Sequence, residues 1–156
     1  MLVSSPISVT GSPMTPDDRP VPPQPSLNAD TAFFWEGLQK GRLLIQRCEA
    51  CGLLRHPPGP SCTRCHSFAW DTQTSTGVGF LVSFVVVHRP RHPAFDYPLA
   101  VGLIELEGGV RMVAPLAIDN QLSIEIGMPL RVVIEPIAGE HRLPKFQAIS
   151  EAKADA

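Results

Sequence analysis

All four cysteines of this 156-residue chain lie between positions 48 and 65, in the stretch CEACGLLRHPPGPSCTRC. They form two Cys-x-x-Cys pairs on either side of a proline-rich connector. Each pair presents two thiolates from one tight turn, and two such turns together supply the four sulfur ligands of a tetrahedral metal site. The spacing therefore predicts a structural metal held by Cys48, Cys51, Cys62 and Cys65, and this site limits how the surrounding residues can fold.

Zinc is the ion that this ligand set predicts, although iron also binds four sulfurs and the sequence does not separate the two. A catalytic zinc keeps one coordination position open for water or substrate, whereas four cysteines close the shell. We therefore expect the ion to stabilise a segment that is too short to build a core, and not to catalyse a reaction.

The two metal-binding turns differ at the residue that follows each pair. Gly52 follows Cys51, and glycine readily adopts the positive φ that a turn around a metal requires. His66 stands at the matching place after Cys65, where it fits less easily. We therefore expect the second turn to be looser than the first.

The first residues, MLVSSPISVTGSP, have neither the basic start nor the apolar run of a secretory signal, and no later stretch is long enough to span a bilayer. We therefore expect a cytoplasmic protein with no membrane partner. In the cytoplasm the cysteines stay reduced, which favours metal binding over disulfides. The net charge of -2 provides no positive field for a phosphate backbone, so we expect no nucleic-acid partner either.

The chain is predicted to divide into five parts. Its beginning is rich in Pro, Ser, Thr and Asp and cannot bury enough apolar surface to offset the entropy of ordering. Asn28 is then typical of a helix N-cap, and Gly41 of a helix stop. The predicted parts are a disordered tail over 1–26, a helix over 27–41, a zinc ribbon over 42–75, a β-strand domain over 76–150 and a second tail over 151–156.

Three adjacent aromatic residues, Phe33, Phe34 and Trp35, lie inside the predicted helix. They cannot all face one small core. One interpretation is that the helix covers its own domain, and the other is that the surplus rings dock on a partner, because interfaces are enriched in aromatic residues. The sequence leaves both interpretations open.

The segment after position 76 changes to short strands separated by turns. LAVGLIEL and VRMVAPL are joined through Gly108 and Gly109, a pair that supports a two-residue hairpin, and LRVVIE and KFQAI flank a polar loop. About five short strands in so few residues fit a strongly curved barrel, so the predicted fold is mainly β with a five-stranded OB-fold barrel over 76–150. In the first strand, GVGFLVSFVVVH, we predict a largely buried apolar face made of Val78, Phe80, Val82, Phe84 and Val86.

Several stretches resemble one known family: FFWEGLQKGRLLIQRCEACG, PPGPSCTRC, VVVHRPRHPAFDYPLAVGLIEL, and IGMPLRVVIE followed by LPKF. The chain is similar to bacterial and archaeal proteins in which an N-terminal helix and a rubredoxin-like zinc ribbon precede an OB-fold. That family was long a domain of unknown function and is associated with acyl-CoA metabolism. Thr63 and His66 depart from its usual proline and glycine, which affects the shape of the second turn and not the four metal ligands.

The resemblance implies a non-catalytic accessory subunit. Members of the family accompany thiolase-like, aldolase or MaoC-type hydratase enzymes, and they are associated with assembling these enzymes or binding acyl-CoA. The catalytic residues would then lie on the partner. The residues of this chain agree, because no cysteine is left for a Cys-His nucleophile and no G-x-S-x-G or phosphate-binding glycine motif is present.

The segment HRPRHPAFDYP, from His88 to Pro98, is the candidate for contact with acyl-CoA. Arg89 and Arg91 are candidates for the phosphates, because a guanidinium matches phosphate oxygens, and Phe95 and Tyr97 would form walls for the adenine or pantetheine. Lys145 and Phe146, which follow Pro144, are further candidates for the same groove, although Phe146 fits the core better. The alternative is an ordinary solvated loop that its prolines stiffen.

Two other functions compete with the accessory role. A nucleic-acid-binding zinc ribbon plus OB-fold would use both modules, but it requires a basic groove with stacking aromatics, and only 6% of the residues are aromatic. A hydrolase or transferase acting alone would need a catalytic set, and the sequence contains none that is recognisable.

Overall fold

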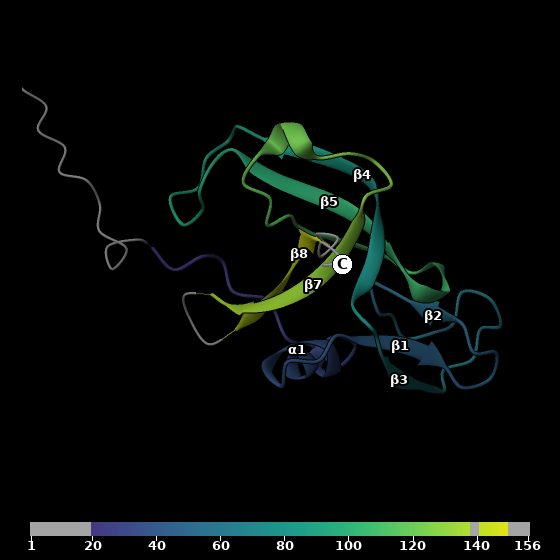
Figure 1. Cartoon of the computed structure of the whole chain (residues 1–156). Coiled ribbons are helices and arrows are strands. Elements are labelled where there is room, and N and C mark those ends of the chain that lie inside the picture. Colours follow the sequence, from purple (N-terminus) through teal and green to yellow (C-terminus); the bar gives the residue numbers. More distant parts are fainter. Residues whose placement is uncertain (1–19, 138–140, 150–156) are drawn as a thin grey trace, which may run out of the picture.

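The structure of the chain, a computed structural model, describes residues 20–137 and 141–149. The tail predicted over 151–156 lies outside the described residues, as does most of the tail predicted over 1–26. Residues 20–26 form neither helix nor strand. The described residues form one α-helix and two antiparallel β-sheets (Figure 1).

The helix α1 (Ala32–Gln39) is shorter at its start than the sequence predicts. The Asn28 side-chain oxygen accepts hydrogen bonds from the backbone N–H groups of Asp30 and Thr31, both at 3.0 Å. Asn28 therefore closes a turn that precedes the helix instead of capping the helix itself. The helix ends before Gly41, whose φ of 69° gives the predicted stop. No helix in the described part of the chain has the length and apolarity that crossing a membrane requires.

The three aromatic rings of α1 all contact other parts of the same chain. Phe34 is buried, and its ring centre lies 5.1 Å from that of Trp35 and 5.1 Å from that of His56. Phe33 lies 5.0 Å from Trp70, ring centre to ring centre. These contacts favour the interpretation that the helix covers its own chain.

The first sheet follows α1 and contains the predicted ribbon strands. Its order is β2-β1-β3, with both neighbours antiparallel to β1. The pairing of β1 with β3 runs from Leu44 opposite Thr74 to Cys48 opposite Trp70, so the strand that enters the first metal turn lies beside the strand that leaves the second. The three strands are β1 (Leu44–Cys48), β2 (Leu54–Arg55) and β3 (Trp70–Thr74).

The second sheet has five antiparallel strands in the order β6-β5-β4-β7-β8. It closes on itself through a bridge between Leu116 and Phe146, supported by a hydrogen bond of 2.7 Å from Ala117 N to Phe146 O. This nearly closed barrel confirms the predicted mainly-β fold with a five-stranded barrel. Its strands are β4 (Val78–Val87), β5 (Leu99–Leu106), β6 (Arg111–Pro115), β7 (Pro129–Pro136) and β8 (Arg142–Ala148), with short 3₁₀ turns at Glu107–Gly109 and Gln121–Ser123.

The predicted apolar face of β4 is wrong for the first half of the strand. Val78 and Phe80 point outward, with 37% and 58% of their surface exposed, whereas Gly79 and Leu81 are buried. The register shifts between Leu81 and Ser83, which marks a β-bulge. A bulge inserts one extra residue and moves the inward face to the other set of alternate positions. Beyond it, the predicted inward positions Val82, Phe84 and Val86 are half-buried, and so is Val87 at the end of the strand.

The turn between β5 and β6 has three residues, Glu107–Gly109, where the sequence predicts two. It is closed by a hydrogen bond of 2.7 Å from Leu106 N to Val110 O. Gly108 and Gly109 have φ values of 71° and 74°, so both glycines adopt the left-handed conformation that the tight reversal requires.

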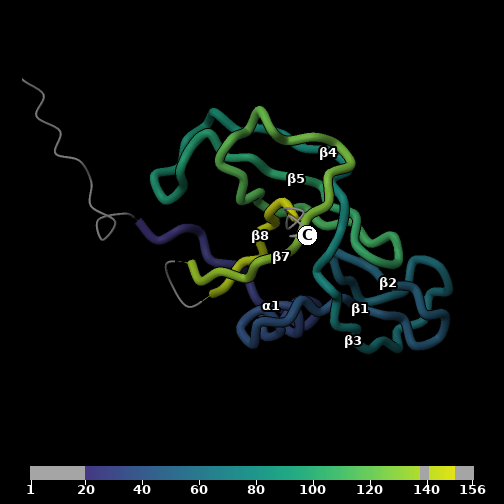
Figure 2. The backbone as a smooth tube through the Cα atoms, viewed as in Figure 1, coloured from purple at the N-terminus to yellow at the C-terminus, as the bar shows by residue number. Residues whose placement is uncertain are grey.

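One hydrophobic core connects the helix, the ribbon and the barrel. Figure 2 shows α1 beside β1 and close to β8, and α1 contacts both strands. The barrel is therefore not packed independently of the metal-binding part. The buried members of this core include Phe34 and Leu38 from the helix, Leu43 and Ile45 from the ribbon, and Leu81, Ile104, Leu130 and Phe146 from the barrel.

The close contact of β4 with β5 at Gly79 gives a test of the barrel. A Cβ atom at Gly79 would lie 2.4 Å from the carbonyl oxygen of Glu105, whereas a Cβ atom at Gly59 would meet nothing within 4 Å. Gly79→Ala is expected to lower the free energy of unfolding by about 1–3 kcal/mol, because backbone must shift. Gly59→Ala should stay within about 0.5 kcal/mol of the wild type in the same urea titration. Equal effects of the two substitutions would contradict this packing.

Candidate metal centre and neighbouring pockets

The two metal-binding turns, residues 48–52 and 62–66, have the same backbone hydrogen bonds. In the first turn, Cys48 N donates to Leu53 O at 3.0 Å and Gly52 N donates to Cys48 O at 2.9 Å. In the second, Cys62 N and His66 N donate to the equivalent carbonyl oxygens, both at 2.9 Å. Gly52 has φ 72° and His66 has φ 59°, so the histidine adopts the left-handed conformation as well. The expectation of a looser second turn is therefore wrong with respect to its hydrogen bonding.

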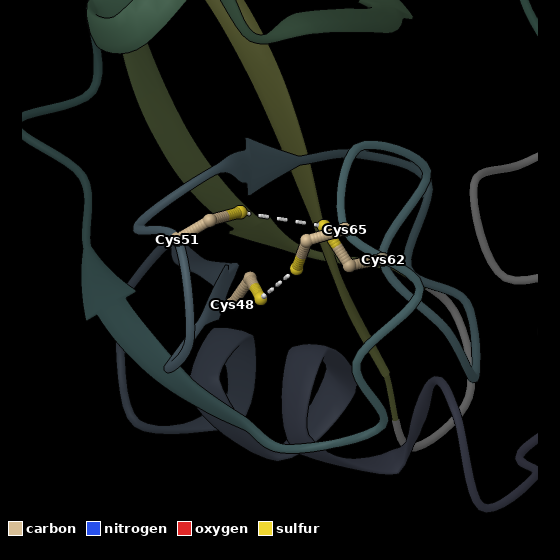
Figure 3. A group of neighbouring side chains, drawn as sticks. All are labelled: Cys48, Cys51, Cys62 and Cys65. Carbon is tan, nitrogen blue, oxygen red and sulfur yellow. Dashed lines mark hydrogen bonds between the residues drawn. The ribbon is translucent and has the colours of Figure 1, made fainter.

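The four sulfur atoms point toward one another from the ends of these turns (Figure 3). All four Sγ atoms lie within 4.8 Å of one another, and the Cys48–Cys65 and Cys51–Cys62 pairs are both 3.6 Å apart. A tetrahedral ion with sulfurs at about 2.3 Å requires sulfur–sulfur distances of about 3.8 Å, and a disulfide would require about 2.05 Å. The arrangement therefore fits one four-coordinate metal ion, with a structural role.

The backbone around Cys62 favours the thiolate form that a metal requires. The backbone N–H of Cys65 lowers the pKa of the Cys62 thiol to about 6, while burial opposes this shift and the N–H of Arg64 adds to it. Arg64 N lies 3.4 Å from Cys62 Sγ. Because metal binding displaces the thiol protons, the lowered pKa of Cys62 favours binding at neutral pH. The N–H of Ser67 lowers the pKa of the Cys65 thiol, but burial and the three other thiols raise it to about 12, so this ligand opposes binding.

The metal ligands differ in burial. Cys48 and Cys62 are buried, Cys51 is half-buried and Cys65 is exposed, so the site lies at the edge of the ribbon with its two buried sulfurs toward the interior. With four sulfurs in the shell, no coordination position remains for substrate. The geometry supports a metal that holds two turns together.

Gln46 is a structural residue that the sequence analysis missed. It is 1% exposed, and its side-chain oxygen accepts hydrogen bonds from Gly59 N at 3.0 Å and from Arg55 Nε at 2.8 Å. Its side-chain nitrogen donates to Gly59 O at 3.0 Å. Gln46 therefore fixes the connector between the two cysteine pairs to β1. The sequence contains no motif for this role, because the partners lie 9 and 13 residues away.

The four residues predicted to contact acyl-CoA occupy different positions in one loop. Arg89 and Arg91 are exposed. Tyr97 is half-buried, and its hydroxyl oxygen accepts a hydrogen bond of 3.1 Å from the backbone N–H of His92. Phe95 is 38% exposed and lies against a cavity of about 380 Å³. The loop thus presents its arginines to solvent and its phenylalanine to a cavity.

The cavity beside Phe95, here named the loop pocket, also has Lys145 in its wall, as the sequence analysis predicted. The Lys145 ammonium lies 2.7 Å from a carboxylate oxygen of Glu135. Asp96, Pro115 and Leu143 contribute further parts of the wall. The loop pocket therefore has apolar surfaces together with charges of both signs.

A second cavity, here named the junction pocket, lies where the helix, the cysteine connector and the barrel meet. It has a volume of about 290 Å³. Phe34 and Trp35 line it from α1, and His56 lines it from the connector. Pro115 and Leu143 line it from the barrel and also line the loop pocket, so the two cavities share a wall. No sequence motif indicated this pocket.

Comparison with known proteins identifies the family. The model of the rubredoxin-like zinc ribbon domain of ChsH2 matches residues 35–71, and the model of the C-terminal OB-fold domain of ChsH2 matches residues 72–135. A chain of the solved Ltp2-ChsH2(DUF35) aldolase is 46% identical, with a TM-score of 0.76 over 80% of this chain and 98% of that chain. The chain belongs to the ChsH2 (DUF35) family. The predicted zinc-ribbon and OB-fold resemblance is confirmed.

Curated relatives have related descriptions. The chain is 50% identical to a probable enoyl-CoA hydratase alpha subunit of Thermomonospora curvata, over 80% of this chain and 39% of that protein. It is 44% identical to the 3-oxo-4,17-pregnadiene-20-carboxyl-CoA hydratase alpha subunit of Mycobacterium tuberculosis, over 69% of this chain and 34% of that protein. A DUF35 domain-containing scaffold protein of Methanocaldococcus jannaschii is 26% identical, over 66% of this chain and 75% of that protein. The chain thus spans well under half the length of the two hydratase subunits.

Removal of one sulfur tests the structural role of the metal. Cys62→Ser is expected to leave less than one metal ion per chain and to unfold the ribbon, because a structural site supplies on the order of 10 kcal/mol. Elemental analysis and thermal unfolding measure the two effects. Thr63→Ser, at the exposed neighbouring position, should keep the metal and the melting temperature. A folded Cys62→Ser ribbon without metal would contradict the assignment.

Exchange of the two left-handed residues tests the strain in the second turn. His66→Gly is expected to raise the free energy of unfolding of the metal-loaded chain by about 1 kcal/mol, because glycine has no steric cost at φ 59°. Gly52→His should lower it by about 1–2 kcal/mol, since a Cβ atom there meets no neighbour and only the backbone is strained. Denaturant titration measures both. If both substitutions changed the free energy of unfolding in the same direction, backbone conformation would not be the main cause of the change.

Proposed function

We propose that this chain is a non-catalytic accessory subunit that assembles in the cytoplasm with a separate acyl-CoA enzyme of the thiolase-like, aldolase or MaoC-type hydratase class. The observation that carries the proposal is the 46% identity to a chain of the Ltp2-ChsH2(DUF35) aldolase, 98% of which this chain covers. The descriptions of the relatives as hydratase subunits and as a scaffold protein support the same role. Because the chain spans only 39% and 34% of the two hydratase subunits, their activity is not assigned to it.

The metal site supports an accessory role. A metal bound by all four sulfurs would have a closed shell, and it would leave neither an open coordination position nor a cysteine nucleophile among the described residues. We assign zinc to this site, because the ligands and their spacing match a structural zinc ribbon. The reaction itself then takes place on the partner enzyme.

Acyl-CoA is the proposed ligand of the assembled complex. Arg89 and Arg91 are exposed on the loop between β4 and β5, where their guanidinium groups can reach phosphate oxygens of a bound ligand. Phe95 in the wall of the loop pocket provides an apolar surface for the rest of the cofactor, and Tyr97 supports the loop through its hydrogen bond to His92. These four residues are the proposed acyl-CoA contacts.

Affinity capture from the native host tests the assembly. The full chain is expected to recover a thiolase-like, aldolase or hydratase protein in stoichiometric amount, identified by mass spectrometry. Arg89→Ala combined with Arg91→Ala should keep this assembly and weaken CoA binding by the complex at least about tenfold, because each charge-assisted hydrogen bond contributes roughly 1.5–3 kcal/mol. Arg131→Ala, which removes an exposed arginine from β7, is the control and should leave binding unchanged. Acyl-CoA turnover by the isolated chain, or recovery of nucleic acid with a steep salt dependence, would contradict the proposal.

A further inference from the structure

The junction pocket is bounded by rigid and apolar groups. Phe34 and Trp35 contribute rings, and four prolines lie in the same wall. Proline has no backbone N–H and a fixed φ, so these positions offer no hydrogen-bond donor and cannot easily collapse into the space. A cavity of about 290 Å³ with such walls is preformed for an apolar ligand. The prolines are Pro57 and Pro58 of the connector, Pro115 of β6 and Pro144 of β8.

No residue that lines the junction pocket is charged at neutral pH. Its polar side chains are Thr31 and His56. Thr31 already donates its hydroxyl hydrogen to the Asn28 side-chain oxygen, at 3.0 Å. Burial lowers the pKa of His56, so its imidazole is neutral. An anionic group would find no counter-charge in this pocket, whereas a hydrocarbon group has no polar atoms to desolvate on entering it.

The loop pocket has a different chemistry. Lys145 and Asp96 provide opposite charges in one wall, and Lys145 is already paired with Glu135 at 2.7 Å. Such a wall is poorly suited to a phosphate, because the carboxylates repel it, but it suits neutral amide and hydroxyl groups. The exposed arginines Arg89 and Arg91 stand at the beginning of the same loop that lines this pocket.

The three regions follow one another in a fixed order. The uncharged junction pocket shares Pro115 and Leu143 with the loop pocket, and the loop pocket is lined by the loop that carries the arginines. A CoA thioester has the same order of chemistry: an apolar acyl group, a pantetheine arm with amides and a hydroxyl, and negatively charged phosphates. The sequence of an uncharged pocket, a neighbouring pocket with charges of both signs and a loop with two exposed arginines therefore matches the order of charge along this ligand class.

We propose that the junction pocket binds the acyl group of a CoA thioester whose pantetheine arm lies in the loop pocket. This assignment rests on the proposed function and adds the position of the acyl group. The accessory chain thereby selects for the length of the acyl group, since a pocket of about 290 Å³ has room for a limited number of methylenes. A side chain of the partner enzyme is the competing occupant, and it would give binding that does not depend on acyl length.

Calorimetric titration of the full, metal-loaded chain with CoA, butyryl-CoA, hexanoyl-CoA and octanoyl-CoA tests this assignment. Affinity is expected to rise by about fourfold for each methylene that the pocket covers, because apolar surface leaves water. Leu143→Trp adds bulk to the wall that both pockets share and should abolish the dependence on length. Leu103→Trp is the matched control, because Leu103 is also half-buried on the barrel but lines neither pocket. It should retain the dependence.

Three results would overturn the assignment: an affinity that is the same for CoA and octanoyl-CoA, a dependence that survives in Leu143→Trp, or an equal loss in both tryptophan variants. Metal content and thermal unfolding confirm that each variant is folded. Affinity capture of the partner enzyme is measured on the same variants. If the partner enzyme is recovered but the affinity does not depend on acyl length, the acyl site is wrong and the accessory function stands. If the affinity depends on acyl length but no partner enzyme is recovered, the accessory function is wrong and the acyl site stands.

Discussion

The sulfur cluster is the constraint on which the rest of this structure depends. It joins two turns that are separated by the proline-rich connector, and Gln46 fastens the middle of that connector to β1. The connector then brings His56 to 5.1 Å from the ring of Phe34 on α1. A metal at the edge of the ribbon therefore determines the shape of a pocket that contains no metal ligand.

The helix has a central place in this arrangement. Its buried face joins the core that the ribbon and barrel share, and its other rings contact Trp70 of the ribbon and His141 of the barrel side. The aromatic residues that looked surplus in the sequence are thus distributed over three neighbours. A short helix of eight residues has little stability by itself, so these tertiary contacts hold it in place.

The sequence predicted those features that depend on neighbouring residues alone. It did not predict the features that depend on contacts between residues far apart in the chain. Cysteine spacing predicted the sulfur cluster, and Gly41 predicted the end of the helix. The inward face of β4 could not be predicted, because the bulge after Leu81 arises from pairing with β5 and β7. The position of Gln46 was missed for a related reason: a buried glutamine in a short strand is explained only by its partners on the connector.

The residues that could bind a ligand were also predicted only in part from the sequence. The composition of the loop between β4 and β5 indicated Phe95, and Lys145 of β8 was predicted to line the same groove; both line one cavity. The sequence did not predict the junction pocket. Its walls come from the helix, the connector and two barrel strands, and each of these has an ordinary apolar pattern. Pockets between elements depend on how the elements pack, which no single segment specifies.

The shared core has a consequence for association. Since α1, the ribbon and the barrel contribute to the same hydrophobic cluster, turning one module against another would expose part of this shared core. A protein that binds across both modules meets a surface whose shape is fixed beforehand, and it need not immobilise two independently moving bodies. The shared core thus reduces the entropic cost of forming such a complex.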